Sequence, residues 1–144
     1  MPGKVLKGLK IIIVHPYEIS RKGMGALLKQ HEIKQVMLFQ SLDELINLSK
    51  IPGADLILIH YSEFKENNIN YLIKNTNAKV ALLASKNLFH QNSFEEIQEK
   101  IMAGISGFLD IDENLYNFFS ELVDVAAGDI VISKKFAQNL LMKD

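Results

Sequence analysis

Short runs of apolar residues alternate along the chain with longer segments that mix apolar and polar positions. The five runs are residues 11–14, 36–39, 56–59, 80–83 and 108–109. Most of them are too short for a helix. Their unbroken apolar character is typical of strands that are buried on both faces of a parallel sheet. The pattern therefore predicts five strands separated by helices.

The segments between these runs have the spacing of helices with one buried face. The first such face is predicted to comprise Ile19, Gly23, Ala26 and Leu27. The last and strongest apolar stripe comprises Leu115, Phe118, Phe119, Leu122 and Val123. Gly128 follows this stripe and indicates a helix stop, because glycine readily adopts the left-handed conformation found there. A further helix is expected over residues 68–75.

Three serine residues mark predicted helix starts. Ser41 stands three positions before Glu44, and Ser93 stands three positions before Glu96, which is the spacing of a capping box. Ser133 is predicted to be the N-cap of a last helix that carries Phe136, Leu140 and Leu141. Residues 130–132 form a short extended piece before it.

Alternation of strands and helices indicates right-handed βαβ crossovers and a parallel sheet covered on both faces. We therefore predict an α/β fold: a flavodoxin-like, doubly wound (βα)5 three-layer sandwich with strand order 2-1-3-4-5. The domain is expected to span residues 1–128. Residues 129–144 are expected to form the extended piece and a C-terminal linker helix.

Composition narrows the range of functions. The 144 residues are 48% hydrophobic and 23% charged, which suits one globular domain. A formal net charge of −1 provides no basic field for nucleic acid or anionic membrane. Without cysteine, the chain has no disulfides, thiolate metal sites or cysteine nucleophiles. The longest apolar run near the start is too short to span a membrane, so we expect a cytoplasmic protein with no membrane partner.

Ligands of doubly wound sheets bind beyond the carboxyl ends of the strands, where the strand order reverses. Here the first and third predicted strands run into His15-Pro16 and His60. The fourth ends at Ala84, and the fifth runs into Asp110-Ile111. Any site is therefore expected among these positions.

Five segments resemble, in order and spacing, the motifs of one known family of domains. Among them, residues 80–85, VALLAS, are similar to its V-V-V-L-T-A strand. Residues 12–21, IIVHPYEISR, resemble its I-V-D-D-H-x-x-x-R opening. Residues 54–60, ADLILIH, are similar to its P-D-V-V-L-L-D strand, and residues 103–109, AGISGFL, to A-G-A-x-G-Y-L. Residues 126–133 resemble its A-A-G-x-x-x-x-S tail, which precedes a linker to a helix-turn-helix domain. Together these segments resemble the receiver domain of response regulators of the NarL/FixJ class, whose output domains are of the LuxR type.

The resemblance also implies where the chain departs from a working receiver. The acidic pair, the phosphoacceptor aspartate, the hydroxyl and the lysine of such a domain correspond here to His15 with Pro16, His60, Ala84 and Ile111, while Phe108 keeps the aromatic position. Magnesium prefers hard oxygen ligands, and phosphoryl transfer depends on charge stabilisation. The resemblance thus implies a degenerate pseudo-receiver with no catalytic residues, no metal and no cofactor.

The function expected from this resemblance is a phosphorylation-independent regulatory and dimerisation module of a two-component-type transcriptional regulator. We expect a homodimer, with DNA bound only through an output domain that this chain does not contain. The alternative is a small-molecule sensor that uses the vacated pocket at the strand ends. An enzyme is the least favoured reading, since the sequence has no nucleophile–base pair and no Gly-rich phosphate loop.

His15 and His60 are open to two interpretations. They could bind a transition metal, with Glu18 or Glu63 as a further ligand, although two imidazoles fall short of the usual ligand number. The interpretation we favour is that they are polar plugs that fill the emptied site. Burial and a like-charged neighbour both disfavour imidazolium, so plugs are expected to have lowered pKa values.

Overall fold

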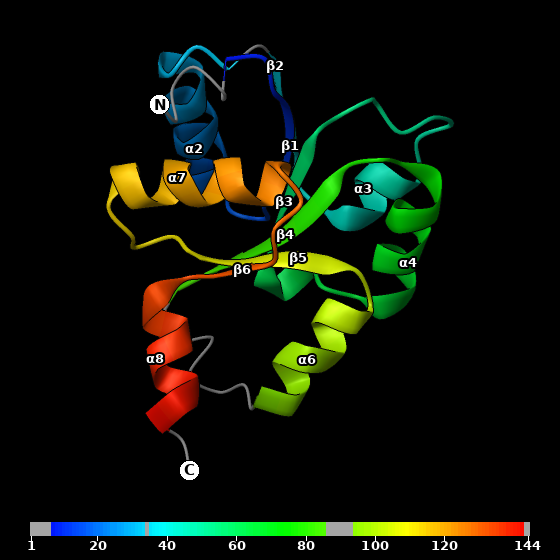
Figure 1. Cartoon of the computed structure of the whole chain (residues 1–144). Coiled ribbons are helices and arrows are strands. Elements are labelled where there is room, and N and C mark those ends of the chain that lie inside the picture. Colours follow the sequence, from blue (N-terminus) through cyan, green and yellow to red (C-terminus); the bar gives the residue numbers. More distant parts are fainter. Residues whose placement is uncertain (1–6, 34, 86–93, 143–144) are drawn as a thin grey trace.

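The computed structural model describes residues 7–33, 35–85 and 94–142, and its centre is a parallel sheet (Figure 1). The strands are β1 (Lys10–Val14), β2 (Gln35–Phe39), β3 (Leu56–His60), β4 (Lys79–Ala84), β5 (Ile105–Asp110) and β6 (Val131–Ile132). Their order is β2-β1-β3-β4-β5-β6, so the predicted fold and order are confirmed and one short strand is added.

Helices cover both faces of the sheet (Figure 1). On one face lie α2 (Glu18–Gln30) and α7 (Leu115–Ala126). The other face carries α3 (Leu42–Ile46), α4 (Glu66–Asn75), α6 (Phe94–Met102) and α8 (Lys134–Met142). A 3-10 turn, η1 (Tyr61–Glu63), follows β3. Because side chains alternate along a strand, Ile11 and Ile13 enter one core while Ile12 and Val14 enter the other.

The predicted buried face of α2 is wrong. Ile19 is 90% exposed, and the buried residues of the helix are Gly25 and Leu28. A Cβ at Gly25 would lie 3.1 Å from a Leu38 methyl group, so glycine allows the helix to approach β2 closely. Because Gly25 has no apolar side chain, it adds nothing to the apolar periodicity, and the sequence pattern indicates the neighbouring face of the helix instead.

Two other predicted elements are longer in the structure. The helix expected over 68–75 starts at Glu66, and the last central strand starts at Ile105 rather than Phe108. Gly107 interrupts the apolar run, but the strand needs it, because a Cβ there would lie 2.9 Å from the Ala81 Cβ and 3.0 Å from Val125. Ser41 caps α3 as predicted, its Oγ accepting the Glu44 N–H at 3.1 Å. Ser93 lies outside the described residues.

The segment after α7 joins the sheet. Gly128 has φ +103, and its N–H donates to the Val125 carbonyl at 3.0 Å, which confirms the predicted helix stop. β6 then pairs in parallel with β5, and Phe136 of α8 is buried in the core at 2% exposure. The division of the chain at residue 128 stays a prediction. Within the described ranges, no helix is both long and apolar enough to cross a bilayer.

Candidate functional site

Two histidines lie side by side where the first and third strands end. His15 directly follows β1, and His60 is the last residue of the neighbouring β3. Their ring centroids are 4.4 Å apart, with 48° between the ring planes. The side chains are buried, at 1% and 6% exposure, whereas Pro16 is half-buried. The structure therefore brings together the two histidines predicted to share this site.

Both imidazoles accept a hydrogen bond from the backbone two residues further on. His15 Nδ1 accepts the Tyr17 N–H at 3.2 Å, and His60 Nδ1 accepts the Ser62 N–H at 3.2 Å. The Ser62 hydroxyl lies 2.7 Å from the same His60 nitrogen. A ring nitrogen that accepts an N–H carries no proton itself, so these bonds assign the proton of each neutral ring to Nε2.

The surroundings keep both rings neutral. Burial, together with the charges of His60 and Arg21, lowers the pKa of His15 from its ordinary 6.5 to about 4. Burial also lowers the pKa of His60, although the nearby Glu63 carboxylate acts in the opposite direction. The lowered pKa values expected for buried plugs are confirmed for both residues.

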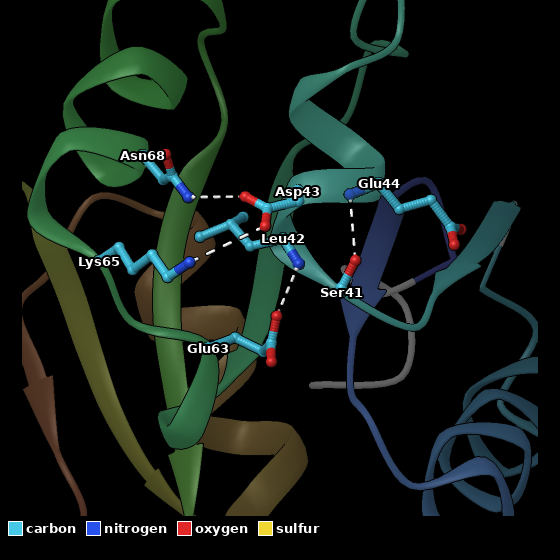
Figure 2. Close-up of polar contacts among 7 residues, drawn as sticks. All are labelled: Ser41, Leu42, Asp43, Glu44, Glu63, Lys65 and Asn68. Carbon is cyan, nitrogen blue, oxygen red and sulfur yellow. Dashed lines mark hydrogen bonds and ion pairs between the residues drawn. The ribbon is translucent and has the colours of Figure 1, made fainter.

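Glu63, one of the two suggested extra metal ligands, is bound elsewhere. Its Oε1 accepts the Leu42 N–H at the start of α3 at 2.8 Å (Figure 2). Beside it, Asp43 accepts a hydrogen bond from Asn68 at 3.3 Å and lies 3.8 Å from the Lys65 ammonium group. These contacts tie the turn after His60 and the start of α4 to α3.

Glu18, the other suggested ligand, forms an ion pair with Lys22 at 3.3 Å. Within the part of the chain that the structure describes, no three His, Cys, Asp or Glu residues are grouped so as to hold a metal ion. His15 and His60 therefore remain a pair without a third ligand among those residues.

The other predicted positions of the site differ in burial and in contacts. Ala84 is fully buried at the end of β4, and its carbonyl accepts the Ile111 N–H at 3.1 Å. Phe108 is fully buried in the core that faces α3, α4 and α6. Ile111 is 38% exposed. Ile111 is therefore close to Ala84, whereas Phe108 packs within the core.

A cavity of about 280 Å³ lies beside the histidine pair, between α2 and α7. His15 forms one wall and Ile111 another, and the remaining lining is largely apolar. His60 does not line it. The sequence predicted a pocket between the ends of the first and third strands, but the two imidazole rings occupy that place, and the open space is on the α2–α7 side.

A second buried polar cluster was missed from the sequence. Asp110 is fully buried at the end of β5; its Oδ1 accepts the Asp112 N–H at 2.8 Å, and its Oδ2 has no hydrogen-bond partner among the described residues. The Asp110 N–H donates to Ser133 Oγ at 3.0 Å, and the Ser133 hydroxyl donates to Glu121 Oε1 at 3.0 Å. The sequence predicts only a capping role for Ser133, and Glu121 has no signal in the sequence beyond its place on a helix.

The pKa of Glu121 is raised from its ordinary 4.5 to about 7. Burial is the largest cause, and the neighbouring acidic groups, including Asp110, add to it. The hydrogen bond from Ser133 opposes the rise. Helix α7 thus places a carboxyl group with a raised pKa next to the end of β5.

Three solved structures show which fold this is. A LuxR family DNA-binding response regulator from Silicibacter pomeroyi superposes with a TM-score of 0.67 at 20% identity, covering 89% of this chain and 98% of that one. The isolated REC domain of RcsB from Salmonella enterica serovar Typhimurium gives 0.69 at 17% identity, covering 92% and 99%. A two-component response regulator of the LuxR family from Aurantimonas gives 0.72 at 13% identity, covering 93% and 96%.

The chain has the fold of a receiver domain. No protein-family model matches its sequence, and no curated protein matches it either. At such identities the likeness extends to the fold alone. The ends of β1 and β3 hold the imidazoles of His15 and His60, whereas the buried carboxyl group of Asp110 lies at the end of β5 and the half-buried one of Glu121 lies on α7.

Proposed function

We propose that this chain is a phosphorylation-independent, receiver-like module that regulates and dimerises a two-component-type transcriptional regulator. The observation that carries the proposal is the contact between His15 and His60, with ring centroids 4.4 Å apart, at the ends of the two strands where a receiver would hold Mg²⁺ and its phosphoacceptor. Neutral imidazoles provide neither the oxygen ligands nor the negative charge that this chemistry requires. We infer that regulation here works without phosphoryl transfer.

The test is exposure of the purified protein to acetyl phosphate with and without Mg²⁺, followed by intact mass measurement. We expect no Mg²⁺-dependent phosphoryl adduct. His60→Asp alone is expected to stay inactive, because His15, Pro16 and Ile111 would still leave the acceptor without metal ligands or a counter-charge. A phosphorylatable receiver treated in parallel serves as the positive control. A Mg²⁺-dependent adduct on the wild-type protein would overturn the proposal.

Self-association is the second part of the proposal. Ile19 on α2 is 90% exposed and Tyr116 on α7 is 73% exposed, so the α2–α7 side carries uncovered apolar surface. A two-fold dimer suits regulators that bind paired DNA half-sites, and DNA binding would belong to a separate output domain in the cytoplasm.

Sedimentation over a wide concentration range tests this part. Ile19→Glu is expected to weaken the dimer at least tenfold, since it would bury a charge at the interface. Leu141→Glu is the matched control: Leu141 is 81% exposed, on the α8 helix that packs against the opposite face of the sheet. A strictly monomeric wild-type protein at high concentration would count against dimerisation.

A further inference from the structure

We propose that the cavity between α2 and α7 binds a neutral, largely apolar small molecule that carries a hydrogen-bond acceptor, and that His15 Nε2–H donates to this acceptor. The inference goes beyond the proposed function by giving the module a ligand class. It does not depend on whether the protein can be phosphorylated.

The size and lining of the cavity set the apolar part of this ligand. Its volume of about 280 Å³ suits a molecule with one aromatic ring and a short substituent. Met24 and Leu27 of α2 line one side, and Phe118 and Phe119 of α7 line the other. Water gains few hydrogen bonds in such surroundings, so an apolar molecule can replace it at little cost.

The polar part follows from the hydrogen bonds of His15. Its Nδ1 accepts the Tyr17 N–H, which leaves the ring proton on Nε2. Among the described residues, no hydrogen bond to this Nε2 is found, and His15 lines the cavity. A ligand oxygen in the cavity would give this N–H group a partner.

Charge excludes the two ionic classes of ligand. An anion in the cavity would meet the Glu113 carboxylate on the wall and a neutral His15, whose pKa is lowered to about 4. The nearby cation, Arg21, donates to the His15 carbonyl at 2.8 Å and does not line the cavity. A cation would lose its hydration against an apolar lining. A neutral ligand avoids both costs.

The experiment uses three probes of similar shape: acetophenone, ethylbenzene, which lacks the acceptor, and benzoate, which is an anion. Each is titrated into the ¹⁵N-labelled full chain without Mg²⁺ or phosphodonor, and amide shifts give the dissociation constants. We expect shifts centred on α2 and α7, with acetophenone binding about fivefold more tightly than ethylbenzene, the effect of one neutral hydrogen bond. Benzoate is expected to bind more weakly than both.

Two variants locate the site. Gly23 lines the cavity, and a Cβ there meets nothing within 4 Å, so Gly23→Leu should fill the space and abolish binding of both neutral probes. Gly53→Leu, at another glycine with open space, is the matched control and should leave binding unchanged. His15→Phe should lower acetophenone binding to the ethylbenzene level while ethylbenzene binding stays the same.

Several outcomes would overturn the inference: no shifts at the solubility limit of the probes, tighter binding of benzoate, or equal affinity for acetophenone and ethylbenzene in the wild-type protein. The wild-type series decides the question even if His15→Phe does not fold. Because no phosphodonor is present, these results are independent of the phosphorylation test.

Discussion

The two buried polar clusters at the carboxyl-terminal side of the sheet are built in opposite ways. The histidine pair is satisfied locally, since His15 and His60 each accept an N–H from only two residues away. The acidic cluster joins distant segments: Ser133 bonds to Asp110, 23 positions away, and to Glu121, 12 positions away. Polar groups of the first kind fill space, whereas those of the second kind connect β5, α7 and the start of α8.

The clusters also respond to pH in opposite directions. The pKa of His15 is lowered in the folded state, so the unfolded chain takes up more protons below pH 6.5 and acid destabilises the fold. The pKa of Glu121 is raised, so the folded state holds the extra proton between about pH 4.5 and 7. Stability through Glu121 therefore falls as pH rises across this window. Burial of a base and burial of an acid therefore change the stability of the fold in opposite directions as pH rises.

Ser133→Ala should have the largest effect on this comparison. It removes the acceptor of a buried N–H and the donor to Glu121, which should lower the free energy of unfolding by about 2 kcal/mol. Denaturant unfolding at pH 7 measures this loss of free energy. Ser62→Ala is the matched control in the histidine pair, and it should cost less than about 0.5 kcal/mol, because Ser62 keeps its N–H bond to His60. Equal losses would contradict the distinction between connecting and local clusters.

The second effect concerns acid sensitivity. Stability through the histidines should be intact above pH 6.5 and decline as pH falls towards the lower folded pKa values, by about 1 kcal/mol between pH 7.5 and 5. His60→Gln should reduce this slope, since His15 alone would still titrate. The denaturant midpoint is best compared in a Glu121→Gln background, which removes the opposing titration. Identical slopes with and without His60 would mean that this ring is not a buried neutral plug.

The smallest effect is expected for Glu121→Gln itself. Glutamine can still accept the Ser133 hydrogen bond but carries no charge to bury. Above pH 7 the variant should be more stable than wild type by up to about 1 kcal/mol, a limit set by solvent screening of a half-buried group. The gain should disappear below pH 4.5, where both proteins are uncharged at this position. Thermal unfolding of both proteins at pH 8 and at pH 4 checks this difference. An equal gain in stability at the two pH values would refute the raised pKa of Glu121.

The sequence predicts the sheet well because buried parallel strands leave short, unbroken apolar runs that need little context to recognise. It predicts helix faces less well where glycine makes the contact. Gly25 and Gly107 pack closely because they have no side chain, and their contacts with Leu38 and Ala81 become visible only in three dimensions.

The site, too, has one part that the sequence predicts and one part that only the three-dimensional structure shows. His15 and His60 stand at strand ends, so the parallel topology alone predicts that they meet. The link from Asp110 through Ser133 to Glu121 spans a strand, a helix and a two-residue strand, and no spacing along the chain indicates it. The cavity was expected at the strand ends, but two imidazole rings fill that volume, and only packing decides that the space opens beside α7.

The short strand β6 has a consequence for aggregation. It pairs with Gly107 and Phe108 of β5, and the Ser133 N–H adds a bond to the Phe108 carbonyl at 2.9 Å. Without this cover, β5 would present a row of unpaired backbone groups to which a strand of another molecule could add. A two-residue edge offers very little template for such addition. We expect a fragment that ends at residue 128 to precipitate or form β-rich oligomers where the chain through residue 142 stays dispersed.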